Sequence, residues 1–494
     1  GDAQRRGDEP LLVSEFGTWG LPTLSALRKH WHDGAPPGWW ATGHWWGSGE
    51  MSYPVGAEER FATSGLEAIW RDYDEFAKAT QQHEGRALKA QIELIRSQPT
   101  IQGYVITEFT DIFWEANGLL DFYRQPKAFH DSLMAYNGPD ILIPKWERTS
   151  YWGGETLRLP ITLSHWSGAA TGECRLRWAI PSLGLEGDRP IEGPDVGMTV
   201  PLGAISAGLP NPGTSRAIRV DIWLEHADGQ VITRSFHDVM LVSRASGDPR
   251  REMTVLVNDP RYLDLHGASS ASFELASPAE LQSEGESSPT ESDDLWVDTD
   301  PEGGVIRRGS RSGQAAMRGL SNTLSRLGYR MADSLDQAEL VVATKLDRRI
   351  LDRLKAGGRL LFLPLETSPF FHVSGRGTGR DGNWISAFHW LRPDLPLSVP
   401  VENPLDFAFT DVLPERVILG HGGHMSCDVL AGLVTGWVHL PTATICQFRY
   451  GRGTVVMCTW KLRGYAGSDP VATALLHDLI AYAASDACNP ETTL

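Results

Sequence analysis

The sequence predicts a multidomain protein with the last two βα units of a (β/α)8 TIM barrel, then an immunoglobulin-like β-sandwich, then a doubly wound α/β domain. Three observations predict this. The 494 residues exceed what one hydrophobic core organises. Strand and helix patterns alternate at both ends of the chain, and short strand patterns fill the middle. We place the three domains at residues 1–137, 138–246 and 247–494.

Two short apolar runs, at residues 11–13 and 101–106, predict barrel strands. Ser14-Glu15-Phe16-Gly17 closes the first run, and Thr107-Glu108 follows the second. The apolar residues between them recur at helical spacing, namely Leu66, Ile69, Trp70, Tyr73, Phe76 and Ala77, then Ala87, Leu88, Ile92 and Ile95. A full barrel needs about 250 residues and eight such units, so the other strands must come from elsewhere.

Residues 141–244 show short alternating segments, such as 156–163 and 217–224, separated by Gly, Pro and Ser. This pattern predicts a β-sandwich of immunoglobulin-like size. An apolar strand at 253–257 then precedes an acidic, Ser-rich stretch at 266–313, which we expect to be a mobile insertion.

The third domain is predicted from alternating helix and strand patterns after that insertion. We expect helices at 315–327 and 349–355 and strands at 340–343, 359–363 and 454–458. Pro470 favours the first turn of a last helix that ends near residue 484. Such alternation is typical of a parallel sheet.

Composition excludes several classes of partner and cofactor. The net charge of −17 would repel nucleic acid and anionic membrane surfaces, and no run of about 18 apolar residues exists, so we expect a soluble protein. The five cysteines are odd in number and show no CxxC spacing, which indicates neither a disulfide framework nor a zinc site. His421 and His424 have no third ligand at a recognisable spacing, so we predict no metal centre there. The sequence does not indicate a compartment.

Glu15 is the first candidate for chemistry because reacting groups of a βα barrel project from the C-terminal ends of its strands. A carboxylate there can attack an anomeric carbon while a second acid protonates the leaving oxygen. Taken alone, the tetrapeptide of residues 14–17 is weak evidence for catalysis, because a glutamate at this position would more commonly just end the strand and pair with an arginine.

Two motifs together change that balance. Residues 10–17, Pro-Leu-Leu-Val-Ser-Glu-Phe-Gly, resemble the seventh-strand nucleophile motif of glycoside hydrolase family 2, which includes β-galactosidases, β-glucuronidases and β-mannosidases. Residues 103–127 are similar to its eighth strand and following loop, including Arg-Gln-Pro-Lys at 124–127. The resemblance implies a retaining double displacement with Glu15 as nucleophile, and carboxyl groups about 5 to 5.5 Å apart. It implies no organic cofactor, although some members bind Mg²⁺ or Na⁺.

The resemblance also implies that the acid/base is a glutamate after an asparagine on the fourth barrel strand, well before the nucleophile. Only 14 residues precede Glu15. We therefore expect an N-terminal companion polypeptide that completes the barrel and carries the acid/base, either a separate gene product or a fragment released by proteolysis near Arg5-Arg6.

Candidate substrate-binding residues lie after the second strand and in a Trp-rich loop. Glu108 and Asp111 could bind sugar hydroxyls, or instead hold neighbouring groups and cap loop amides. Trp114 could stack on a pyranose or be a core residue. Trp45 and Trp46 could form a sugar platform or a hydrophobic plug against a partner.

The substrate is predicted to be a terminal β-linked neutral sugar, with β-galactosides first and β-mannosides or β-glucosides next. Thr107-Glu108 stands where better-known members have Trp-Asn, so the sugar subsite must differ. The Asn-x-Lys motif of β-glucuronidases is replaced by residues 115–117, Glu-Ala-Asn, which argues against uronic acids.

The third domain resembles the class I glutamine-amidotransferase-like fold, but residues 360–364 lack the cysteine that such enzymes need. We expect it to be structural or oligomerising, in an oligomeric enzyme. The rival function is a non-catalytic carbohydrate-binding or scaffolding protein on an incomplete barrel, and an amidotransferase-like hydrolase is a weaker alternative.

Overall fold

The structure is a computed structural model that describes residues 9–41, 53–168, 172–250, 252–258, 297–299, 305–307, 319–365, 367–375, 386–405, 407–420 and 428–494. The predicted insertion at 266–313 lies outside these ranges, apart from the strands β12 (Val297–Thr299) and β13 (Val305–Arg307), which pair antiparallel. Among the described residues, no helix has the length and apolar character to span a membrane.

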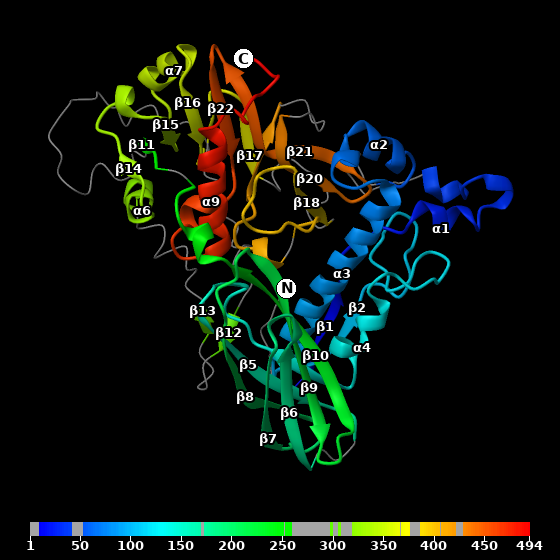
Figure 1. The fold of residues 1–494 in the computed structure, drawn as a ribbon. Helices are drawn as coiled ribbons and strands as arrows, with labels where there is room; N and C mark the ends of the chain where they lie inside the picture. The colour runs from blue at the N-terminus through cyan, green and yellow to red at the C-terminus, as the bar shows by residue number, and fades with distance from the viewer. Residues whose placement is uncertain are drawn as a thin grey trace.

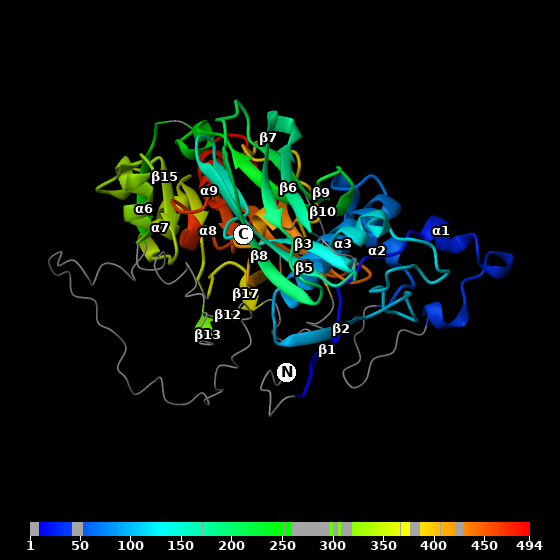
Figure 2. The same cartoon turned by 90° about the horizontal axis from the view of Figure 1, so that it is seen from below.

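The N-terminal region contains one sheet of two parallel strands, β1 (Leu11–Phe16) and β2 (Ile101–Ile106), which lie side by side in Figure 2. Its helices and 3-10 turns are α1 (Leu24–Arg28), η1 (His32–Gly34), η2 (Gly38–Ala41), α2 (Ala57–Thr63), η3 (Leu66–Ala68), α3 (Tyr73–Arg96), η4 (His130–Ser132) and α4 (Met134–Asn137). β2 has the predicted bounds. β1 continues beyond the predicted end, so Glu15 lies inside the strand.

Helix α3 connects the two strands and is the longest helix of this region. Asp72 caps its first turn by accepting a hydrogen bond from the backbone N–H of Glu75 at 2.8 Å. Its buried side chains recur at helical spacing, and Leu88 and Ile92 form a core with Phe129 and residues on the inner face of the β1–β2 pair. The two helical patterns of the sequence therefore belong partly to one continuous helix.

Residues 140–242 form two sheets that share one core. The first has the order β3 (Asp140–Pro144), β5 (Thr156–His165), β8 (Met198–Gly208). The second has the order β4 (Ser150–Trp152), β10 (Val231–Val242), β9 (Arg216–His226), β6 (Glu173–Ile180), β7 (Leu185–Glu192). Alternate apolar residues of both sheets, such as Leu159 and Val220, are completely buried between them. An immunoglobulin-like arrangement of these sheets stays a prediction.

The third unit is built on a ten-stranded sheet. Its parallel half has the order β14 (Arg330–Met331), β11 (Thr254–Asn258), β15 (Leu340–Ala343), β16 (Arg359–Phe362), β22 (Gly453–Cys458). The other half is antiparallel and comprises β21 (His439–Tyr450), β20 (Val429–Thr435), β19 (Arg416–Leu419), β18 (Ala387–Leu391) and β17 (His372–Gly375). The expectation of a wholly parallel sheet is therefore wrong for this half, where tight connections such as residues 436–438 replace crossover helices.

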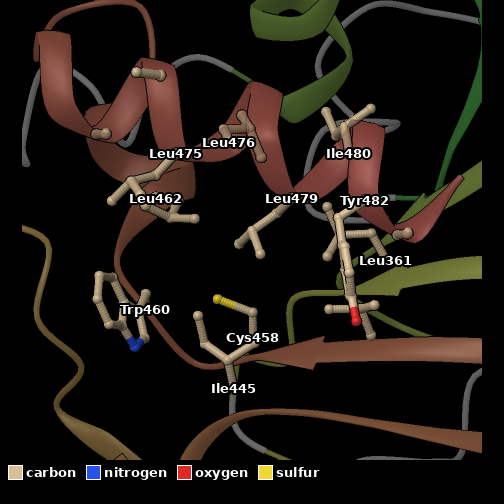
Figure 3. Packing of buried hydrophobic residues seen from close by; sticks show 14 of the residues in the cluster. Leu361, Ile445, Cys458, Trp460, Leu462, Leu475, Leu476, Leu479, Ile480 and Tyr482 are labelled. Atoms are coloured by element: carbon tan, nitrogen blue, oxygen red, sulfur yellow. The ribbon is translucent and has the colours of Figure 1, made fainter. Parts of the chain in front are cut away.

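The helices of the third unit lie beside the parallel half of its sheet (Figure 1). They are α6 (Leu320–Arg326), α7 (Arg348–Lys355), α8 (Leu462–Tyr465) and α9 (Pro470–Ala483), with 3-10 turns η8 (Leu335–Gln337) and η9 (Phe407–Phe409); η5 (Pro181–Leu183) and η6 (Arg244–Gly247) belong to the preceding region. Asp469 caps α9 by accepting from Ala472 N–H at 2.7 Å, and Pro470 takes the predicted first-turn position. Figure 3 shows Leu479 of α9 pointing toward Cys458 and Ile445, which lie on strands of the sheet.

The N-terminal region and the third unit share a hydrophobic core rich in aromatic rings. Phe76 of α3 meets Phe388 of β18 edge to face, with ring centroids 5.7 Å apart. In Figure 1, α2 and the upper part of α3 lie beside β20 and β21. The third unit therefore supports the region that carries Glu15.

Candidate active site

Glu15 and Glu108 are brought to the same end of the parallel pair. The register places Val13 opposite Tyr104 and Phe16 opposite Ile106, and Thr107 N–H extends the ladder to Phe16 O at 2.8 Å. The pairing is irregular between Val13 and Phe16, where Glu15 lies. Such an irregularity can re-aim a side chain. Glu15 is exposed to solvent there.

Gly17 lets the two strand ends come close together. A Cβ atom on Gly17 would lie 2.1 Å from the carbonyl oxygen of Thr107. Because this oxygen belongs to the backbone, a change of side-chain rotamer could not remove the clash. The glycine after the nucleophile candidate is therefore required by the approach of β1 to β2. The following peptide, between Thr107 and Glu108, is cis.

Glu108 is held in place through its own backbone. Its N–H donates to Asn117 O at 3.0 Å, and its carbonyl accepts from Leu119 N–H at 3.0 Å. Burial, followed by the neighbouring carboxyl group of Glu115, raises the pKa of Glu108 to about 7, and Asp111 and Glu15 act in the same direction. At neutral pH a substantial fraction of Glu108 is protonated and can donate a hydrogen bond.

Glu115 is the second member of this carboxyl pair, and the sequence did not single it out as a site residue. The Asn117 amide donates to Glu115 Oε2 at 3.3 Å, and the carbonyl of the same Asn117 accepts from Glu108 N–H, so Asn117 links the two glutamates. A nearby carboxyl group disfavours the charged form of its neighbour, so Glu115 adds to the effect of burial in raising the pKa of Glu108. Glu15 lies close enough to influence the same equilibrium.

Asp111 is fully buried, so in this structure its carboxylate does not face solvent. Lys127 Nζ lies 2.8 Å from Asp111 Oδ1, which also accepts from Gly118 N–H at 2.9 Å. Lys127 also contacts Glu84 Oε2 at 3.1 Å, and that pair is fully buried too. Burial raises the pKa of Asp111 to about 6, although Lys127 opposes the shift. This arrangement matches the second of the two roles expected for Asp111, that of holding and capping the loop.

Trp114 is only 6% exposed, and its ring lies 5.9 Å from that of Trp19 within the shared core. Its carbonyl accepts a hydrogen bond of 2.7 Å from the Trp437 indole. In this structure Trp114 is a core residue, which is the alternative left open above.

Trp45, Trp46, His421 and His424 lie outside the described residues. The described part of the Trp-rich loop packs inward, since Trp40 is 5% exposed and lies 5.6 Å from the ring of Trp437. Trp39 lies 4.7 Å from Phe122. These two residues pack into the core that the N-terminal region shares with the third unit, so they do not test the roles predicted for Trp45 and Trp46.

Within the described residues, His, Cys, Asp and Glu side chains form no group of three that could hold a metal ion.

Sequence reasoning missed Lys127, Glu84 and Trp437 as residues that shape the site. Lys127 carried a signal, because it ends the Arg-Gln-Pro-Lys motif. Glu84 and Trp437 carried none, since their partners are distant in sequence.

No family model and no curated protein sequence matches the chain. Solved structures that are similar to parts of it include an exo-chitosanase and a β-glucuronidase. An exo-chitosanase from Amycolatopsis orientalis, in complex with PNP-β-D-glucosamine, is 15% identical over 34% of this chain and 19% of its own, with a TM-score of 0.22. A β-glucuronidase from Parabacteroides merdae is 11% identical over 44% of this chain and 29% of its own, with a TM-score of 0.14.

Both neighbours are glycosidases by name, but at these TM-scores the similarity carries no argument. The chain spans less than a third of the length of either neighbour, 19% and 29% respectively. The amidotransferase-like character of the third unit stays a prediction.

Proposed function

We propose that the chain is the C-terminal part of a retaining exo-β-glycosidase in which Glu15 is the nucleophile and a companion polypeptide supplies the acid/base. One observation carries the proposal. The parallel pairing of β1 and β2 brings an exposed carboxyl group, Glu15, and a partly protonated one, Glu108, to the same strand ends.

In the first step, the Glu15 carboxylate attacks the anomeric carbon and forms a glycosyl ester, while the companion's acid gives its proton to the departing oxygen. In the second step, the companion's carboxylate takes a proton from water, whose oxygen attacks the anomeric carbon. The ester bond breaks, the sugar is released with retained configuration, and Glu15 is again a carboxylate.

Glu108 would serve as a hydrogen-bond donor to a sugar hydroxyl beside Glu15. Its protonated form carries no charge, so it can approach the anionic nucleophile without like-charge repulsion. The substrate series to test begins with β-galactosides, followed by β-mannosides and β-glucosides.

The need for a companion is supported by the β1–β2 pair itself. A two-stranded sheet is marginal on its own, and parallel sheets are normally covered on both faces. Here one face packs on α3, and on the other Leu12 and Val105 are 59% and 57% exposed. Six further barrel strands would pair both edges and cover this face.

The test is hydrolysis by the chain together with a companion that carries the other six βα units. Glu15→Gln should abolish turnover, whereas Glu59→Gln, at an exposed glutamate on α2, should not. A slow 2-fluoro glycoside should label the peptide that contains Glu15. Unchanged hydrolysis in Glu15→Gln would refute the nucleophile assignment. Sugar binding without any turnover would favour the non-catalytic scaffold instead.

A further inference from the structure

The connection between β20 and β21 places a tryptophan from the third unit inside the N-terminal region. β20 ends at Thr435 and β21 begins at His439, so Trp437 sits at the tip of a tight connection. Tips of such connections normally face solvent, yet Trp437 is 0% exposed. The hairpin tip is therefore inserted into another part of the molecule.

The backbone of this tip adopts an uncommon conformation. Val438 has φ of 64° and Leu440 has φ of 50°, both in the left-handed region. A β-branched residue there is an outlier that persists only where the surroundings impose it. The packing around Trp437 supplies that constraint.

Trp437 contacts three segments of the N-terminal region. Its indole N–H donates to Trp114 O at 2.7 Å. Its ring lies 5.6 Å from that of Trp40, at 70°, and 6.4 Å from that of Phe122, at 26°. Its own carbonyl accepts from Arg60 Nε at 3.1 Å and Nη2 at 2.9 Å. Trp437 thus contacts the Trp-rich loop and the loop after β2 through its side chain, and α2 through its backbone carbonyl.

Trp114, whose carbonyl accepts the bond from Trp437, directly precedes Glu115 in the chain. Ile112 and Glu115 close a tight turn through reciprocal backbone hydrogen bonds of 3.1 and 2.8 Å, and Trp114 lies within it. The Glu115 carboxyl group accepts from the Asn117 side-chain amide at 3.3 Å, and the Asn117 carbonyl accepts from Glu108 N–H at 3.0 Å. Displacement of Trp114 would therefore move Glu115 relative to Glu108.

We propose that Trp437 is a positioning residue of the candidate site: its hydrogen bond to Trp114 fixes the turn of residues 112–115, so that Glu115 stays against Glu108 beside Glu15. The third unit thereby contributes to the site without touching substrate. The effect of Trp437 on catalysis rests on the proposed function, whereas its effect on the turn of residues 112–115 does not.

Hydrogen exchange measured by mass spectrometry tests the structural part on the chain alone. Trp437→Phe keeps an aromatic ring and removes the donor. Loss of one buried hydrogen bond should speed exchange in peptides covering residues 109–120 by about 3- to 10-fold. Trp460→Phe is the matched control, because Trp460 is 4% exposed, lies in the same unit and donates to Thr444 at 3.0 Å, within a different core cluster. It should leave those peptides unchanged.

Wild-type exchange of residues 109–120 in Trp437→Phe would overturn the proposal, and so would equal acceleration in both variants. If Trp437→Phe does not fold, Arg60→Gln loosens the same tip through the Trp437 carbonyl and should accelerate the same peptides. In the assembled enzyme, Glu108→Gln should remove the limb of the pH–rate profile that reports on Glu108. That limb should move to lower pH in Trp437→Phe, because Glu115 would no longer raise the pKa of Glu108 as much. It should stay fixed in Trp460→Phe. An unmoved limb would also overturn it. Hydrogen exchange needs no turnover, so failure of the glycosidase proposal can be distinguished from failure of the proposal for Trp437.

Discussion

Lys127 Nζ lies 2.8 Å from the Asp111 carboxylate where neither side chain has any solvent exposure. Glu84 completes the group from α3, at 3.1 Å from the same ammonium. A buried ion pair contributes little net stability when intact, but removal of one partner leaves an uncompensated charge. Lys127 therefore joins α3 to the loop after β2, in which Glu115 also lies.

Lys127→Met should destabilise the N-terminal region by about 3 to 5 kcal/mol at pH 8, and by less at pH 5. Burial already raises the pKa values of Glu84 and Asp111, and Lys127 opposes both shifts. Without Lys127 both pKa values rise further. The folded state then holds protons that the unfolded chain releases, so stability falls as pH rises above the ordinary carboxyl range.

Urea unfolding at pH 5 and pH 8 measures this difference. Lys78→Met, on an exposed position of α3, is the control and should change stability by no more than about 0.5 kcal/mol. An equal loss for Lys127→Met at both pH values would show that the buried charges are not the cause.

Gly118→Ala should destabilise the loop that holds Glu108 and Asp111. A Cβ atom there would lie 2.1 Å from Asp111 N and 2.6 Å from Leu120 O, which are backbone atoms that no rotamer change can move. The cost should be about 1 to 3 kcal/mol, visible as a lower thermal midpoint. Gly208→Ala, where a Cβ atom meets nothing within 4 Å, should leave the midpoint near that of the wild type. A normal midpoint for Gly118→Ala would contradict the tight backbone approach.

Much of the secondary structure follows from local pattern. The strand at residues 340–343 has the predicted bounds, and α9 begins at Pro470 because Asp469 and Pro470 are favourable cap and first-turn residues. β1 ends at Phe16 rather than at residue 13, since pairing with β2 extends it past its apolar run. Pairing with a distant strand leaves no local mark.

The site was predictable only in part. Glu15 and Glu108 follow from strand ends and motif spacing, and the structure brings those ends together. The hydrogen bond between Trp437 and Trp114 joins residues 323 positions apart, and nothing near either tryptophan in the sequence indicates it. Lys127 stood in the Arg-Gln-Pro-Lys motif, but its buried pairing with Asp111 and Glu84 was not predictable, because lysine is rarely buried unless paired and these partners lie on other elements.

Glu108→Gln should reduce the pH dependence of stability. The pKa of Glu108 is raised to about 7, mainly by burial and then by Glu115. A raised carboxyl pKa stabilises the fold while the group is protonated, and that stability is lost as pH rises from about 4.5 to about 7. The glutamine variant lacks this titration, so its thermal midpoint should fall less between pH 5 and pH 8. Glu67→Gln, at an exposed position of η3, should retain the wild-type slope. A wild-type slope in Glu108→Gln would place the proton on another group.

Val105→Thr should weaken self-association of the isolated chain. Val105 is 57% exposed and lies on the outer face of the β1–β2 pair, the face that also carries Leu12 at 59%. In the described structure neither strand of this pair has a second neighbour, and open apolar edges template pairing with other chains. Threonine keeps the β-branched shape that favours a strand but adds a hydroxyl group, which should weaken association by about 10-fold. Sedimentation velocity measures this.

Val196→Thr removes a similarly exposed valine, at 48%, between β7 and β8 and is the matched control. If Val196→Thr weakened association as much as Val105→Thr, the association would not be specific to the outer face of β1 and β2. The proposal that a companion covers this face would then lose this support.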